Sequence, residues 1–134
     1  MGKVFIFLVL PLIFLEVQGL SKFNFHGNLG CKLHKFCYHI EIYEEDFLKK
    51  SDDLLKNQTE VISIRPHKYS VSAQDTDDGL DFLRKFEIYM VIYHTCTSVG
   101  KKKRLRYDWG KFDIDVGESY NSKDLELFNL GEDV

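Results

Sequence analysis

A strand-like run of β-branched and aromatic residues, "IYMVIYHTC", ends in a histidine and a cysteine two positions apart, His94 and Cys96. Side chains two positions apart on a β-strand point to the same face. The spacing therefore predicts that this imidazole and this thiol share a face. Such a pair suits three kinds of chemistry: a nucleophilic Cys/His dyad, a metal site or the anchor of a disulfide bond. The two residues by themselves leave all three open.

The chain around this pair is dominated by alternating apolar and polar residues, which is typical of half-buried strands. Glu87–His94 is apolar on both parities, as expected of a central strand. The segment Asp46–Lys56 breaks the alternation, and we interpret it as a surface loop with at most one helical turn. Seven or eight strands predict an all-β, antiparallel sandwich or barrel. The expected strands are Phe23–Cys31, Tyr38–Tyr43, Val61–Ile64, Tyr69–Gln74, Glu87–His94, Arg104–Trp109, Phe112–Val116 and Leu125–Leu130.

The first residues have the pattern of a secretory signal. Lys3 provides a positive start, Val4–Leu15 is an apolar run broken by Pro11, and Val17-Gln18-Gly19 supplies small residues where signal peptidase reads. The run is too short to span a membrane comfortably, and no second one follows. We therefore predict a signal peptide at residues 1–19 and one secreted domain at residues 20–134.

Composition narrows the possible partners. The chain has 18 basic and 21 acidic side chains and a net charge of −3, which argues against a general nucleic-acid or membrane binder. Cysteines of secreted proteins usually pair, so one of Cys31, Cys37 and Cys96 is left over. The residues alone do not decide which of the three is left over. Asn57-Gln58-Thr59 is the N-glycosylation sequon, with Asn57 as the acceptor.

Several motifs, taken in order, resemble the nematode transthyretin-like secreted proteins. The first block is "GNLGCKLHKFCYHIEIYEEDFLKKSDDLL", in which a strand ends in Leu-x-Cys and an acidic stretch leads to Asp-Asp-Leu-Leu. The second block is "YSVSAQDTDD", followed by "FEIYMVIYHTC" with its closing His-x-Cys. A basic strand, "KKKRLRYDW", and the stretch "SYNSKDLELFN" complete the similarity.

The resemblance implies a transthyretin-like (prealbumin-type) antiparallel β-sandwich that is extracellular and often associated with the cell surface. It also implies a disulfide bond between Cys31 and Cys96, the recurrent pair of the family, with His94 beside it in a structural hydrogen bond. With this pairing, we interpret Cys37 as a free thiol or an intermolecular link; the alternative is that Cys37 competes for Cys31 or Cys96. Two turns depart from the family pattern. Lys32–Phe36 replaces Asn-Gly-Lys-Pro, and Pro66-His67-Lys68 replaces Asn-Gly, so both turns must be built differently.

The competing chemistries are less well supported. Same-face neighbours on a strand lie about 7 Å apart, too far for a His94–Cys96 dyad without bending. The histidines and cysteines show no paired C-x-x-C or H-x-x-x-H unit, which zinc sites usually have. A hydrolase of the transthyretin superfamily ends in Tyr-Arg-Gly-Ser, whereas this chain ends in "NLGEDV". We therefore predict no catalytic residue, no metal and no cofactor.

The strongest charge feature is a basic run that is a candidate binding surface for anionic glycans or lipid headgroups. The alternative is a solvated hairpin tip that leads into an edge strand with charged outward positions. The run consists of Lys101, Lys102, Lys103, Arg104 and Arg106.

These observations predict a secreted binding protein without catalytic activity, which recognises an extracellular protein or cell-surface partner through its loops. The loops in question are Lys32–Phe36, Asp46–Lys56, Asp75–Asp81 and Lys101–Arg106. The alternative is a carrier of a small apolar ligand, suggested by the surplus of Phe and Tyr, and a hydrolase is the third possibility. Neither the partner's identity nor the oligomeric state follows from the sequence.

Overall fold

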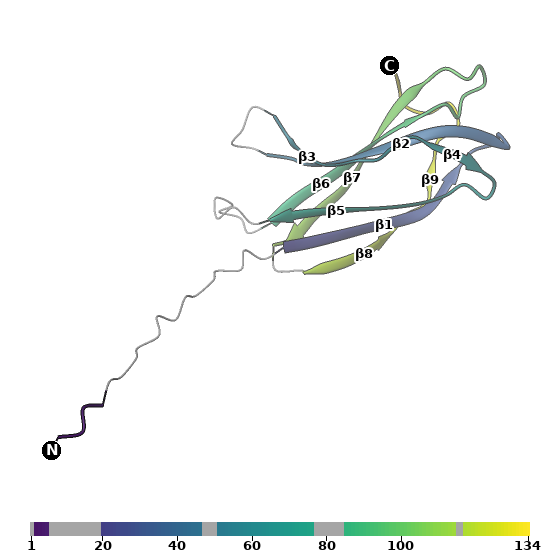
Figure 1. Cartoon of the computed structure of the whole chain (residues 1–134). Coiled ribbons are helices and arrows are strands. Elements are labelled where there is room, and N and C mark those ends of the chain that lie inside the picture. Colours follow the sequence, from purple (N-terminus) through teal and green to yellow (C-terminus); the bar gives the residue numbers. More distant parts are fainter. Residues whose placement is uncertain (1, 6–19, 47–50, 77–84, 115–116) are drawn as a thin grey trace.

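Two β-sheets pack face to face in the part of the chain that the structure describes (Figure 1). The computed structural model describes residues 2–5, 20–46, 51–76, 85–114 and 117–134. Most of the expected signal peptide and the stretch from Asp77 to Asp81 lie outside the described residues. The strands are β1 (Leu20–Gly30), β2 (Lys35–Glu44), β3 (Asp53–Asn57), β4 (Val61–Ile64), β5 (Lys68–Thr76), β6 (Lys85–His94), β7 (Lys103–Asp113), β8 (Glu118–Ser122), β9 (Leu125–Glu126) and β10 (Glu132–Asp133).

The all-β prediction is confirmed, and the pairing is mostly antiparallel. One sheet has the order β5-β1-β8, with β9 also paired to β1. The other has the order β10-β7-β6-β2-β3, with β4 also paired to β2. The prediction of a wholly antiparallel sandwich of seven or eight strands is wrong in two details. Strand β1 runs parallel to β8 and β9, and the described residues form ten strands, two of them only two residues long.

Two element boundaries also differ from those expected. Of the expected loop Asp46–Lys56, residues 47–50 lie outside the described residues, and its last four residues form most of β3. Leu55 packs on the core while Leu54 points outward, as on a half-buried strand. Arg104–Trp109 and the start of Phe112–Val116 form one strand, β7. A β-bulge opposite Ile88/Tyr89 joins them, with Gly110 at φ 93°. The extra residue moves the inward positions from odd to even numbers, so that Phe112 faces the core.

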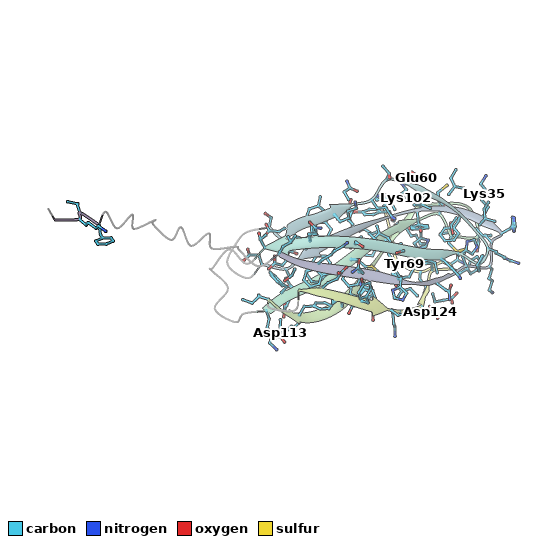
Figure 2. The ribbon with its side chains drawn as sticks, turned by 60° about the horizontal axis from the view of Figure 1, so that its bottom comes forward. Lys35, Glu60, Tyr69, Lys102, Asp113 and Asp124 are labelled. Carbon is cyan, nitrogen blue, oxygen red and sulfur yellow. A yellow bond between two sulfur atoms is a disulfide. The ribbon has the colours of Figure 1, made fainter. Side chains whose placement is uncertain are left out.

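The core fills the space between the sheets, and charged side chains such as Lys35, Glu60 and Asp113 lie outside it (Figure 2). The ring centroids of Phe23 and Phe86 lie 5.7 Å apart in an edge-to-face arrangement. β1, β2 and β6 supply most of the fully buried side chains, which include Phe23, Phe25, Leu29, Ile40, Ile42, Phe86, Ile88, Met90 and Ile92. Strict alternation on β1 and β2 therefore holds the two sheets together, as the sequence pattern indicates.

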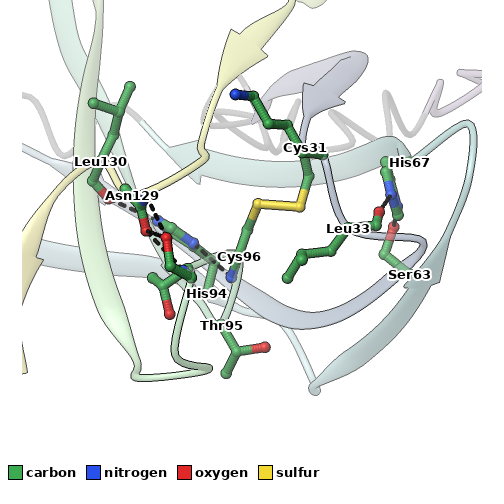
Figure 3. The surroundings of a disulfide bond; sticks show 12 residues. Cys31, Leu33, Ser63, His67, His94, Thr95, Cys96, Asn129 and Leu130 are labelled. Atoms are coloured by element: carbon green, nitrogen blue, oxygen red, sulfur yellow. Dashed lines mark hydrogen bonds between the residues drawn. A yellow bond between two sulfur atoms is a disulfide. The ribbon is translucent and has the colours of Figure 1, made fainter.

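The turns at Lys32–Phe36 and Pro66-His67-Lys68 are tied together by the side chain of His67. Its side chain is 2% exposed and its backbone has φ 55°. The ring Nε2 lies 2.7 Å from the Leu33 carbonyl oxygen, and Nδ1 lies 2.8 Å from Ser63 Oγ (Figure 3). Because a carbonyl only accepts, Nε2 carries the proton and Nδ1 accepts from the Ser63 hydroxyl. A buried imidazole thus fixes the β1–β2 turn against the β4–β5 turn.

Candidate functional site

The two sheets are joined by a disulfide bond between Cys31 and Cys96 (Figure 3). Cys31 follows β1 in one sheet, and Cys96 follows β6 in the other; their Cα atoms lie 6.1 Å apart. Cys96 is fully buried. The bridge is the one that the family resemblance implies. Because the sulfur of Cys96 is bonded to Cys31, it is not available as a nucleophilic thiolate.

His94, the other half of the motif, is also used structurally. Its ring is fully buried; Nε2 donates to the Leu130 carbonyl oxygen at 2.8 Å, and Nδ1 accepts the backbone N–H of Cys96 at 3.1 Å. Burial lowers the pKa of His94, Lys103 lowers it further, and the hydrogen bond to Leu130 acts in the opposite direction. A neutral imidazole therefore links the strand end to the segment before β10.

The third cysteine lies apart from this bridge. Cys37 is a free, half-buried thiol on β2, and its backbone N–H donates to Thr95 Oγ1 at 2.9 Å. His39, two residues further along, stacks on Tyr93 with ring centroids 4.6 Å apart. Within the described ranges, no three His, Cys, Asp or Glu side chains are grouped closely enough to hold a metal ion.

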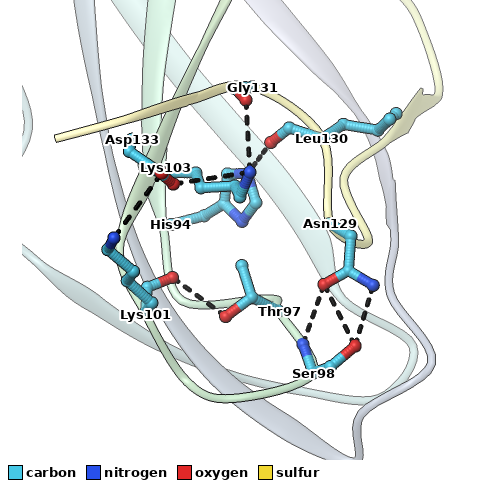
Figure 4. A network of polar contacts seen from close by, with 9 residues as sticks. All are labelled: His94, Thr97, Ser98, Lys101, Lys103, Asn129, Leu130, Gly131 and Asp133. Carbon is cyan, nitrogen blue, oxygen red and sulfur yellow. Dashed lines mark hydrogen bonds and ion pairs between the residues drawn. The ribbon is translucent and has the colours of Figure 1, made fainter.

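The basic run begins just before β7 and continues into it, and the acidic strand β10 pairs with this end of β7. Figure 4 shows Asp133 of β10 beside Lys101 and Lys103. Asp133 forms ion pairs with Lys101 and Lys103, each at 3.5 Å, and Glu132 forms one with Arg104 at 3.3 Å. The two lysines lower the pKa of Asp133. In the part of the chain that the structure describes, Lys102 makes no ion pair. Most of this positive charge is therefore balanced within the molecule.

Arg106, the last member of the run, borders a shallow pocket of about 180 Å³ on the outer face of the six-stranded sheet. Its guanidinium lies 3.7 Å from the centroid of the Tyr89 ring and pairs with Asp108 at 3.0 Å and Glu45 at 3.8 Å. The pocket is lined mainly by charged side chains.

Other predicted positions fall elsewhere. Asn57 is exposed at the end of β3, opposite Glu41, so the sequon is accessible; its glycosylation remains a prediction. Of the loops expected to carry recognition, Lys101–Arg106 is mostly strand, and Asp75 lies within β5. Glu132 and Asp133, which pair with the basic run, were not predicted from the sequence. The sequence feature that could have indicated them is an acidic pair directly after Gly131, in a chain that has one dense basic run to pair with.

Comparison with known proteins identifies a family but no activity. In the described part of the chain, no helix is long and apolar enough to cross a membrane. No curated protein matches the sequence. A family model described as "Caenorhabditis elegans protein of unknown function (DUF870)" matches residues 26–133, which include the disulfide, the basic run and β10. The chain therefore belongs to this nematode family.

Proposed function

We propose that the protein is a secreted, non-catalytic binding protein with a transthyretin-like sandwich, which recognises an extracellular or cell-surface protein. The observation that carries the proposal is the use of His94 and Cys96. One is a neutral buried imidazole, and the other is half of a disulfide bond. Disulfide bonds of this kind persist in oxidising, extracellular environments. The residues best suited to covalent chemistry, His94 and Cys96, thus have structural roles in the sandwich.

The surface best suited to recognition is the exposed basic strand rather than the loops. Arg104 and Arg106 point away from the core, next to Lys101 and Lys102. Glycans and lipid headgroups bind mainly through uncompensated charge. Because Glu132 and Asp133 already balance much of this charge, simple anion binding gains little support. A protein partner that offers shape as well as charge fits this surface better.

The proposal is tested by expressing the whole chain in a eukaryotic secretory cell line. Mass spectrometry of the non-reduced protein from the medium should show removal of residues 1–19, loss of two hydrogens from the Cys31–Cys96 pair, and a glycan. The matched control, N57Q, should lack only the glycan. Retention inside the cell with both thiols reduced would contradict the proposal.

A binding measurement completes the test. The labelled, purified protein should bind saturably to the surface of intact nematode cells, and protease treatment of those cells should abolish the binding. Loss of binding after heparinase treatment alone would favour a glycan as partner instead. Binding of a fluorescent fatty acid without any cell-surface binding would favour the carrier alternative.

A further inference from the structure

Strand β7 is an edge strand whose outer backbone is covered over only two residues. β6 pairs with one side of it from Lys103 to Asp113, whereas β10 pairs with the other side only at Lys103 and Arg104. Among the described residues, no strand pairs with the outer edge from Leu105 to Asp108, before the bulge at Gly110. Unpaired backbone groups of this kind are a template for another strand.

The side chains of this edge are also incompletely covered. On β6, Met90 and Ile92 are fully buried. Their register partners on β7, Tyr107 and Leu105, pack on the core but remain half-buried, as does Trp109 at the bulge. A further strand on this edge would cover them. The edge therefore offers backbone hydrogen bonds and apolar contacts at once.

The existing occupant, β10, is attached in a way that permits release. The preceding segment is fixed, because the Leu130 carbonyl oxygen accepts from His94 and the Asn129 backbone N–H donates to the Cys96 carbonyl oxygen. Gly131 follows at φ 109°, so close to the Arg104 carbonyl that only glycine fits. Beyond this point, the side chains of Glu132 and Asp133 are 78% and 59% exposed. Ion pairs so exposed are weak and are screened by salt.

From these contacts we infer that the outer edge of β7, from Lys103 to Asp108, is a strand-addition site for an acidic, extended segment of a partner protein, and that β10 is its displaceable internal occupant. This inference rests on the proposed function and names the chemistry of the partner.

Charge complementarity identifies the occupant. When β10 leaves, Lys101, Lys103 and Arg104 lose the partners that the structure gives them. A replacement must therefore supply carboxylates along an extended chain. Carboxylates at alternate positions share one face, as the exposed Arg104 and Arg106 do on β7. β10 shows the geometry, because it runs antiparallel to β7 with Glu132 opposite Arg104. Backbone pairing provides affinity in this mode of recognition, and the side chains provide specificity.

The test uses the purified secreted protein and a fluorescein-labelled octapeptide of alternating Glu and Thr. Fluorescence anisotropy at about 50 mM salt measures binding, and about 500 mM salt should weaken it. Two control peptides match it in length: one replaces every Glu by Lys, and one carries Pro at two central positions and cannot pair. Hydrogen exchange of the β7 amides reports whether the peptide adds to the edge.

We expect the Glu/Thr peptide to bind and to slow amide exchange within residues 105–108. E132Q/D133N should bind it about tenfold more tightly, because a larger fraction of molecules has an open edge. R104Q/R106Q should bind it about tenfold more weakly, whereas the matched control K56Q/K68Q, which removes two exposed lysines from β3 and β5, should not change affinity.

Equal binding of the proline peptide would overturn the inference, and so would unchanged affinity of E132Q/D133N. Binding of heparin oligosaccharides or anionic vesicles by the wild-type protein without binding of the acidic peptide would also overturn it. None of these results bears on secretion or on cell-surface binding, so the proposed function stands or fails separately.

Discussion

Removal of the Cys31–Cys96 bridge should cost this domain a large part of its stability. The bridge connects residues 65 positions apart. In the chain-entropy model, a loop of this length restricts the unfolded chain enough to stabilise the folded state by about 4 kcal/mol. A domain of this size has a total free energy of unfolding of about 5–15 kcal/mol. The loss should therefore bring C31A/C96A close to the limit of folding.

The assay is urea unfolding followed by the fluorescence of Trp109, the chain's one tryptophan, which stacks on Phe25 with centroids 4.5 Å apart. C37A serves as the background, because it removes the third thiol and prevents exchange. Compared with C37A, the triple variant C31A/C37A/C96A should lose about 4 kcal/mol. Reduction of C37A with a thiol should produce a similar loss without altering any packed side chain.

Comparing the stability lost on reduction with that lost in the triple variant shows whether the closed loop or side-chain packing is responsible. If reduction and the triple variant each lower the free energy of unfolding by less than about 1 kcal/mol, the bridge does not restrain the unfolded chain as the model requires. If only the variant is destabilised, the effect comes from packing at the fully buried Cys96 and not from the closed loop.

Three further predictions concern the buried side chains of His94 and His67 and the backbone at Gly131. Because burial lowers the pKa of His94, the unfolded state binds more protons than the folded state below about pH 6.5. The stability that neutral His94 contributes is therefore intact above that pH and is lost below it, by at most about 1.4 kcal/mol per pH unit. The free energy of urea unfolding should fall more steeply from pH 7.5 to 5.5 in the wild type than in H94Q, and equal slopes would rule this out. H67A should lower the free energy of unfolding by about 2–3 kcal/mol, since it leaves the Ser63 hydroxyl and the Leu33 carbonyl without their partner. H67N should cost less in thermal unfolding, because asparagine tolerates a positive φ. If H67A were less destabilising than H67N, the role of the imidazole ring would be refuted. G131A should detach β10, since the added Cβ would lie 2.4 Å from the Arg104 carbonyl oxygen. The backbone amides of β10 should then exchange with solvent faster, with little change in Tm. Unchanged exchange would contradict the close approach of Gly131 to Arg104.

Local patterns predicted the strands that are buried on one face. Phe23 and Phe25 on β1, and Ile40 and Ile42 on β2, alternate with polar neighbours and are fully buried. Alternation fails where a strand changes parity. β7 was expected as two strands, because the bulge near Gly110 shifts Phe112 to the inward face. A period-two pattern does not contain the extra residue that a bulge adds.

The disulfide and the sites that depend on distant residues needed more than local patterns. The pairing of Cys31 with Cys96 followed from the family resemblance, since three cysteines allow several connections. His67 was recognised as a departure from the family's turn, but its contacts with Leu33 and Ser63 depend on tertiary structure. Glycosylation at Asn57 and signal cleavage remain predictions of the sequence.

The basic run shows why charge in a sequence differs from charge on a surface. Five basic residues within six positions suggest an anion-binding patch, but Glu132 and Asp133, about 30 positions away, lie against three of them. Sequence distance gave no warning, because a β-ladder brings these residues together. The same pairing changes the kind of ligand expected for the basic run. Because the start of β7 already pairs with an acidic strand of the same chain, an acidic extended ligand is a more specific expectation for this edge than a diffuse polyanion.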